Sequence, residues 1–276
     1  MTANGLVIMG YFFWWSIREV LVKKVDFLAS CKKVGIKYDI KDCDRTAYLN
    51  AVRQVKQQQG QHHVLVRMIA KDKDQHLVGL VDEKVDPKAQ DLQYHHSATM
   101  SFNQKTGLLT CDHPHRAFDL IKDKYNSFKE NLTSYDMRLI IKDIIDKMTP
   151  VTVREGGGIY YADEKFTREL KQVEALLKSL EGCSMVLVPQ INTEDTKKAI
   201  YNSLMEDMNR RLDNFQEEIN NNKFSTPKGW AATLERFRET KKEVEFYAER
   251  LKFSGENVLE KLNAMENQVK AKLMEL

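Results

Sequence analysis

The spacing of hydrophobic residues divides the chain into regions of different character. An apolar run from Leu6 to Trp15 opens the sequence, and charged residues follow it. From His62 to about residue 111, β-rich runs alternate with short polar breaks, whereas apolar residues recur at helical spacing in most of the remainder. This combination predicts an α+β protein in which an antiparallel sheet and its helices precede a helical C-terminal region.

The opening run, Leu6 to Trp15, is too short to cross a bilayer, which takes roughly 20 apolar residues. Arg18 and Glu19 end it, and no basic segment precedes it as in a signal peptide. We predict a buried strand or short core segment and no membrane partner. The alternative is an exposed aromatic surface for contact with a partner or a lipid, because five consecutive aromatic residues lie between Tyr11 and Trp15.

The middle of the N-terminal region predicts a meander. The β-rich runs are HHVLVRMIA, QHLVGLVDEKV, LQYHHSATMSF and GLLTC, and the turn-forming segments KDKD, DPKAQ and NQKTG separate them. We expect about four antiparallel strands. Two helices are predicted before the meander, one that Gly35 ends and one that starts near Asp42 or Asp44 and ends at Gly60.

Two helices and a glycine-rich turn are predicted within residues 114–162. The segment VREGGGIYY does not form a phosphate-binding loop, because Ile159 and two tyrosines follow the glycines where Lys and Ser or Thr would be needed. Gly156 to Gly158 instead favour the tip of a β-hairpin, because glycine readily adopts positive φ. Our preferred interpretation is a hairpin that completes an α+β core.

Two helices followed by a hairpin also resemble a winged helix, in which the second helix enters the major groove of DNA. Acidic residues offset the cations of that helix, although a phosphate-binding surface should be more one-sided. The nucleic-acid hypothesis assigns contacts to Arg138, Lys142, Lys147, Arg154 and Tyr160.

The C-terminal third predicts three amphipathic helices. They follow a helix from Asp163 to Leu180 and a short strand in SMVLVP, and breaks are expected at 220–229 and 254–257. Narrow apolar stripes of this kind are typical of helix hairpins and coiled coils, and Lys241 occupies one otherwise apolar position. We therefore divide the chain into an α+β body, 1–192, and a coiled-coil-like region, 193–276.

The net charge and the cysteines indicate which partners and which cellular compartment to expect. The net charge is only +3, although residues 1–61 carry ten Lys and Arg against five Asp and Glu. The protein as a whole has no strong field that demands nucleic acid or an anionic membrane. Four widely spaced cysteines without a CxxC pair favour reduced thiols and a cytoplasmic location.

The histidines supply the only candidate metal site. All seven lie between residues 62 and 115, and CDHPH places Cys111, His113 and His115 at alternate positions, so an extended chain would direct them to one side. A tetrahedral site needs a fourth ligand that the sequence does not identify. A metal-dependent enzyme is thus a third hypothesis; because HExxH, GxSxG and SxxK motifs are absent, no catalytic residue is assigned and no cofactor is expected.

Two stretches, GYFFWWSIREV (10–20) and REGGGIYY (154–161), resemble an uncharacterised family of hypothetical proteins from phages, plasmids and archaea. The resemblance implies a cytoplasmic, mobile-element context, which is a host cytoplasm if the gene is viral, and it implies no catalytic residue. We expect a non-enzymatic assembly or adaptor protein that acts through self-association or partner binding by its C-terminal helices. The alternatives are a nucleic-acid-binding protein and the metal-dependent enzyme.

Overall fold

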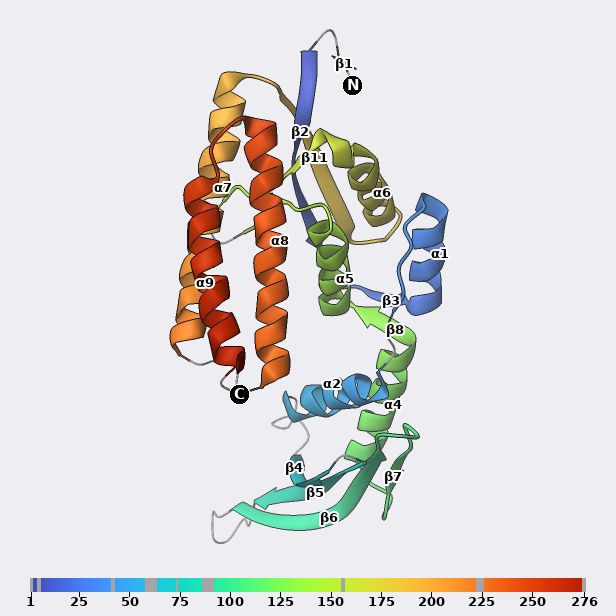
Figure 1. Ribbon diagram of the computed structural model, residues 1–276. Coiled ribbons are helices and arrows are strands. Elements are labelled where there is room, and N and C mark those ends of the chain that lie inside the picture. Colours follow the sequence, from blue (N-terminus) through green and yellow to red (C-terminus); the bar gives the residue numbers. More distant parts are fainter. Residues whose placement is uncertain are drawn as a thin grey trace. The chain divides into compact units, whose positions relative to one another are not determined.

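The computed structural model describes residues 2–3, 6–40, 43–57, 64–72, 74–85, 92–154, 157–221 and 226–274. It contains antiparallel sheets and helices, as predicted (Figure 1). The chain forms two compact units: residues 17–138, here the central unit, and residues 1–16 with 139–276, here the terminal unit. The expected boundary at residue 192 falls inside the terminal unit; as a boundary between independently folding domains it stays a prediction.

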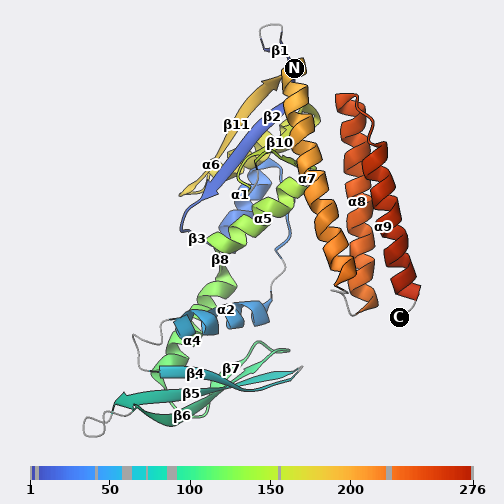
Figure 2. The same ribbon diagram turned by 90° about the vertical axis from the view of Figure 1, so that its left-hand side faces the viewer.

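The terminal unit is built on a five-stranded sheet, in which the long strand β2 lies between β11 and β10 (Figure 2). The strands are β1 (Thr2–Ala3), β2 (Leu6–Ile17), β9 (Val151–Thr152), β10 (Tyr160–Asp163) and β11 (Cys183–Ile191). The predicted strand in the aromatic opening run is therefore confirmed. Met9, Tyr11 and Phe13 are buried in this run, whereas Val7 and Trp14 keep 52% and 38% of their surface exposed.

The two motifs that carry the family resemblance lie on adjacent strands. Strand β10 pairs antiparallel with β2, so that Tyr160 lies opposite Phe13 and Tyr161 opposite Phe12. The Tyr161 hydroxyl donates to the carbonyl oxygen of Met9 at 2.8 Å. Gly10 leaves room for this ring, because a Cβ there would lie 2.5 Å from the tyrosine oxygen. Packing between the two motifs thus explains both the aromatic residues and the glycine.

The glycine-rich segment forms the predicted hairpin. Strands β9 and β10 pair antiparallel, and Gly157 and Gly158 have φ values of 81° and 102°, in the region that favours glycine. Gly156 lies outside the described residues. Because the other edge of β10 pairs with β2, the hairpin is an internal part of the sheet and not a projecting wing.

Helices cover this sheet and complete the terminal unit. A 3₁₀ turn, η1 (Glu164–Phe166), leads into α6 (Thr167–Lys178), and three long helices follow β11. They are α7 (Glu194–Asn220), α8 (Pro227–Leu251) and α9 (Glu256–Met274), which confirms the three predicted C-terminal helices and their breaks. A further helix, α5 (Ser134–Asp146), runs across the boundary between the two units.

The predicted apolar stripes of α7, α8 and α9 are buried within the terminal unit itself. Their side chains form one cluster with Met9, Val151 and Tyr161 of the sheet. The members of this cluster on the three helices are Ile200, Leu204, Met208, Leu212, Phe215, Ile219, Trp230, Phe237, Val244, Tyr247, Leu251, Val258, Leu262, Met265 and Val269. Coiled-coil packing is not confirmed, because the stripes are covered by a helical bundle that also packs on a sheet.

Lys241, the polar residue in the predicted apolar stripe, has a partly buried partner. It forms an ion pair with Glu266 of α9, to which Lys270 also lies within 2.6 Å. The side chains of Lys241 and Glu266 are 20% and 13% exposed. The pair therefore connects α8 to α9 and favours one register of the two helices.

The central unit contains the predicted meander. Its four strands pair in the order β4-β5-β6-β7, and one face packs on α2 and α4. The elements are α1 (Lys24–Val34), α2 (Asp44–Gln57), β4 (Val64–Lys71), β5 (Gln75–Val85), β6 (Leu92–Asn103), β7 (Leu109–Cys111) and α4 (Arg116–Glu130), with a two-stranded sheet of β3 (Leu21–Lys23) and β8 (Asn131–Thr133). Gly35 ends α1 with a φ of 82°, as its position predicted.

The segment 114–162, predicted as one helix–helix–hairpin unit, is divided in the structure. Helix α4 belongs to the central unit, β8 separates it from α5, and the hairpin is part of the terminal sheet. This arrangement differs from a winged helix, because the hairpin is held by its pairing with β2 over 140 residues away in the chain.

Candidate functional site

A charged groove in the terminal unit is the candidate site. It has a volume of about 1090 Å³ and is lined by α5, the β9–β10 hairpin, α7 and α8. Its lining residues include Lys142, Asp143, Asp146, Lys147, Thr149, Thr152, Tyr160, Arg211, Phe215, Glu217, Glu218, Arg236, Glu239, Thr240 and Glu243. The groove thus combines charged side chains with two aromatic ones.

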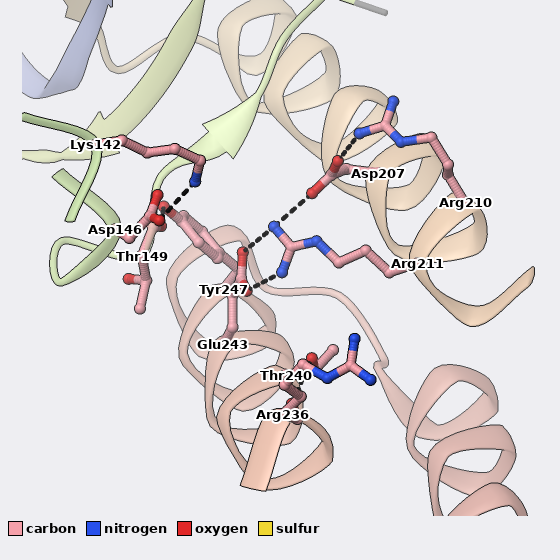
Figure 3. A network of polar contacts seen from close by, with 10 residues as sticks. All are labelled: Lys142, Asp146, Thr149, Asp207, Arg210, Arg211, Arg236, Thr240, Glu243 and Tyr247. Atoms are coloured by element: carbon pink, nitrogen blue, oxygen red, sulfur yellow. Dashed lines mark hydrogen bonds and ion pairs between the residues drawn. The ribbon is translucent and has the colours of Figure 1, made fainter. Parts of the chain in front are cut away.

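A buried ion-pair network forms the wall between α7 and α8 (Figure 3). Arg211 lies 2.6 Å from a carboxylate oxygen of Glu243 and 2.6 Å from one of Asp207. Arg210, one residue earlier, pairs with the second oxygen of Asp207. Asp207 and Glu243 are 3% and 6% exposed. Because α7 supplies the cations and α8 supplies Glu243, the network holds the two helices together.

Burial and charge act against each other in this network. Burial raises the pKa of Glu243, although the nearby Arg211 guanidinium works in the opposite direction. Burial also disfavours the charge of Arg211, but Glu243 and Asp207 together outweigh it, so the Arg211 pKa is raised. The arginine is therefore a permanent cation, whereas Glu243 is held in a position where its charge is costly.

Strained backbone lies at one end of the groove. Thr149 has a φ of 44°, although a β-branched residue strongly disfavours positive φ. Its carbonyl oxygen accepts a hydrogen bond of 2.8 Å from the hydroxyl of Tyr247, whose pKa is raised by burial (Figure 3). The turn after α5 is thereby tied to α8 through the backbone of Thr149.

The cations of the groove all have carboxylate partners. Lys142 pairs with Asp146 within α5 at 2.5 Å, and Lys147, in the turn after α5, pairs with Asp143 at 3.2 Å. Between helices, Arg236 of α8 lies 2.5 Å from Glu218 of α7 and above the ring of Phe215. The four cations face six carboxylates, since Glu217 and Glu239 also line the groove and are exposed. The groove therefore carries a formal charge of 4 − 6 = −2.

Three of the five residues predicted to contact nucleic acid line this groove, namely Lys142, Lys147 and Tyr160. Both lysines are engaged in ion pairs, and Tyr160 stacks on Trp15 with 5.0 Å between ring centroids.

The other two residues of that prediction lie elsewhere. Arg138 donates a 2.6 Å hydrogen bond to the carbonyl oxygen of Ile17 in the central unit. Arg154 is exposed in the hairpin turn, where its carbonyl oxygen accepts from Gly157. The structure does not bring the five predicted residues together on one basic surface.

The predicted metal ligands have separate local roles. His115 caps α4 by accepting from the amide of Ala117, and its Nε2 lies 3.3 Å from Asp82. His113 lies 3.2 Å from its neighbour Asp112. Cys111 is partly buried in β7, and burial raises its pKa. Across the described ranges, no three His, Cys, Asp or Glu side chains are placed to hold a metal ion. His62 and His63 lie outside those ranges.

The sequence patterns did not single out Asp207, Arg211 or Glu243. Each of them flanks the apolar stripe of its helix, beside Met208, Leu212 and Val244. A charged residue next to a buried stripe is the one local signal that could have indicated the network. The partner of each charge lies on another turn or another helix, and helical periodicity alone does not predict that pairing.

Comparison with known proteins identifies the family to which the chain belongs. None of the helices that the structure describes is long and apolar enough to span a bilayer. Neither the curated proteins nor the solved structures contain a match to the chain. A model of the family described as "Family of unknown function (DUF6744)" matches residues 8–276. Since this match takes in almost the whole chain, including both halves of the terminal unit, the protein belongs to the DUF6744 family.

Proposed function

We propose that this protein is a non-enzymatic adaptor that binds a cationic segment of a protein partner in the groove beside α7 and α8. The observation that carries the proposal is the charge balance of the groove. Each of its cations already has a carboxylate within ion-pair distance, and two exposed carboxylates, Glu217 and Glu239, remain in excess. A cationic ligand would gain from this surplus, and a phosphate would be repelled by it.

The walls of the groove favour recognition of a peptide over catalysis. Tyr160, which is partly exposed, offers aromatic surface to the aliphatic stem of a Lys or Arg side chain. The buried ion pairs between α7 and α8 fix the walls in one arrangement, which lowers the entropy cost of binding. A cytoplasmic location and an origin in a phage, plasmid or archaeon belong to the same proposal and rest on the family resemblance and the free cysteines.

Fluorescence anisotropy with a short Lys- and Leu-rich peptide tests the proposal. Glu217→Gln/Glu239→Gln should weaken binding of this peptide by about 2- to 30-fold, because rim charges contribute roughly 0.2–1 kcal/mol each. The matched control is Glu206→Gln/Glu260→Gln, which removes the same charge from exposed positions of α7 and α9 outside the groove. Equal effects of the two double variants would refute binding in the groove.

The same assay separates the adaptor from a nucleic-acid-binding protein. The alternative uses the basic N-terminal segment, residues 1–61, and the hairpin, and it predicts binding of single- or double-stranded DNA or RNA that falls steeply with salt concentration. Labelled oligonucleotides replace the peptide for this purpose. Tight oligonucleotide binding at low salt together with no peptide binding would replace the adaptor proposal by the alternative.

A further inference from the structure

The edges of the sheets differ in how well they are protected against pairing with another strand. Native proteins protect edges by short strands, charges, bulges, proline or a covering element. In the terminal sheet, β9 has only two residues. In the central unit, β7 has three residues, and β4 carries Arg67 and Lys71 together with a register shift between Met68 and Ala70. Each of these edges is protected in at least one of these ways.

Strand β11, the opposite edge of the terminal sheet, contacts helix α6, but it is longer than the other edge strands and lacks their charges and register shift. It is nine residues long, contains no charged side chain, and pairs only with β2 among the described strands. Figure 2 shows it at the side of the sheet, next to β2. Pro189 interrupts only its last part, so Cys183–Val188 offers a proline-free edge.

The surface beside this edge is apolar. Val186 and Val188 on β11 are 39% and 38% exposed, and Ile191 at the end of the strand is 39% exposed. The exposed side of Trp14 lies on the neighbouring strand β2. A second strand placed along β11 would therefore gain backbone hydrogen bonds and also cover apolar side chains.

We propose that β11 pairs antiparallel with β11 of a second copy of this chain, joining two terminal sheets across a twofold axis. A twofold contact brings the same residues of both copies together, so the strand must be complementary to itself. An uncharged strand meets this condition, because no like charges lie opposite each other in any register. Addition of a separate peptide strand does not require this self-complementarity, whereas pairing of two copies does.

The size of this contact predicts a weak, concentration-dependent dimer. One pair of short strands with a few flanking side chains buries less than the roughly 1,600 Å² of a standard stable interface. We therefore expect a dissociation constant on the order of 1–100 µM. This dimer is independent of the groove, because β11 contributes no residue to the groove lining.

Sedimentation velocity of the full chain between about 1 and 500 µM tests the proposal. We place the twofold axis near Val186, at the middle of the proline-free edge, so that the two copies of this side chain lie close together. Val186→Lys alone and Val186→Glu alone should each weaken the dimer at least tenfold, because like charges then face each other. An equimolar mixture of the two variants should restore dimers, since opposite charges now face each other.

The control pair is Val25→Lys and Val25→Glu, at a position of α1 that is 69% exposed, and neither variant should change the dimer. Circular dichroism of each variant confirms that it is folded. A monomer at all concentrations, or a dimer that Val186→Lys leaves unchanged, would overturn the proposal. Dimers that the single variants abolish but their mixture does not restore would also overturn it, since they would indicate a contact that is not self-complementary.

Discussion

Glu266 should contribute pH-dependent stability to the helical bundle, and Glu266→Gln is the variant that measures it. Its carboxylate accepts a hydrogen bond from Lys241, which has the largest effect on its pKa, and another from Lys270. Together they outweigh the opposing effect of burial and lower the pKa from 4.5 to about 2. A carboxyl group with a lowered pKa stabilises the folded state above its unfolded pKa. That stability is lost as the pH falls from about 4.5 towards 2.

The size of the effect follows from the pKa. A change from 4.5 to about 2 corresponds to about 3 kcal/mol, at about 1.4 kcal/mol for each tenfold change in proton affinity. Lys270 is 48% exposed, so solvent screens its share. We therefore expect the charge of Glu266 to contribute about 1–2 kcal/mol near pH 7.

Urea unfolding of the wild type and Glu266→Gln at pH 7, 4 and 2.5, followed by circular dichroism, measures this contribution. The variant should be less stable by about 1–2 kcal/mol at pH 7, and the difference should shrink towards pH 2.5. Glu260→Gln, at an exposed position on the same helix, is the control and should change stability by less than about 0.5 kcal/mol at every pH. A difference between wild type and Glu266→Gln that stays constant from pH 7 to 2.5 would refute the reasoning.

Three further predictions follow from the groove and the cysteines. Arg211→Met should lower the free energy of unfolding by roughly 3–5 kcal/mol, because Glu243 then keeps a buried charge without its partner. Glu243→Gln should lower it by about 1 kcal/mol or less. Urea unfolding compares the two variants, and equal losses would contradict this asymmetry. Thr149→Gly should stabilise the protein by about 1 kcal/mol in the same assay, because glycine adopts the positive φ without strain and the hydrogen bond from Tyr247 to the backbone is kept. A loss of stability would mean that the threonine side chain is needed. Hydrogen bonds from Thr46 lower the pKa of Cys43, whereas burial raises the pKa of Cys31 to about 11. Cys43 should therefore react with iodoacetamide at pH 7.5 several-fold faster than Cys31. Peptide mass spectrometry follows both thiols, and their reaction rates should converge in urea.

Elements whose signal is local could be predicted from the sequence. The glycines at 157 and 158 between two β-rich runs predicted a hairpin, and the polar breaks between residues 62 and 111 predicted a meander. Gly35 predicted the end of α1 because a residue with positive φ commonly ends a helix. In each case the residues that make the structure are neighbours in the chain.

Features that depend on distant pairing could not be predicted in the same way. Strand β10 binds β2 across about 150 residues, and this pairing makes the hairpin part of a sheet. Both segments are rich in aromatic residues, yet no periodicity indicates that Tyr160 stacks on Trp15. The groove depends likewise on Arg211 meeting Glu243 from another helix, a contact that is set by how α7 packs on α8.

The burial of the C-terminal stripes changes where a partner should be sought. Had these stripes been uncovered, hydrophobic association of the helices would have been the natural mode of assembly; instead, they pack into one core with the sheet of their own unit. The two interactions proposed above use other surfaces of the described residues, namely the outer edge of β11 and the exposed carboxylates of Glu217 and Glu239. Backbone pairing is insensitive to salt, whereas contacts to exposed carboxylates weaken as salt is added. Dimerisation that persists at high salt and peptide binding that does not would therefore assign the two interactions to two separate surfaces.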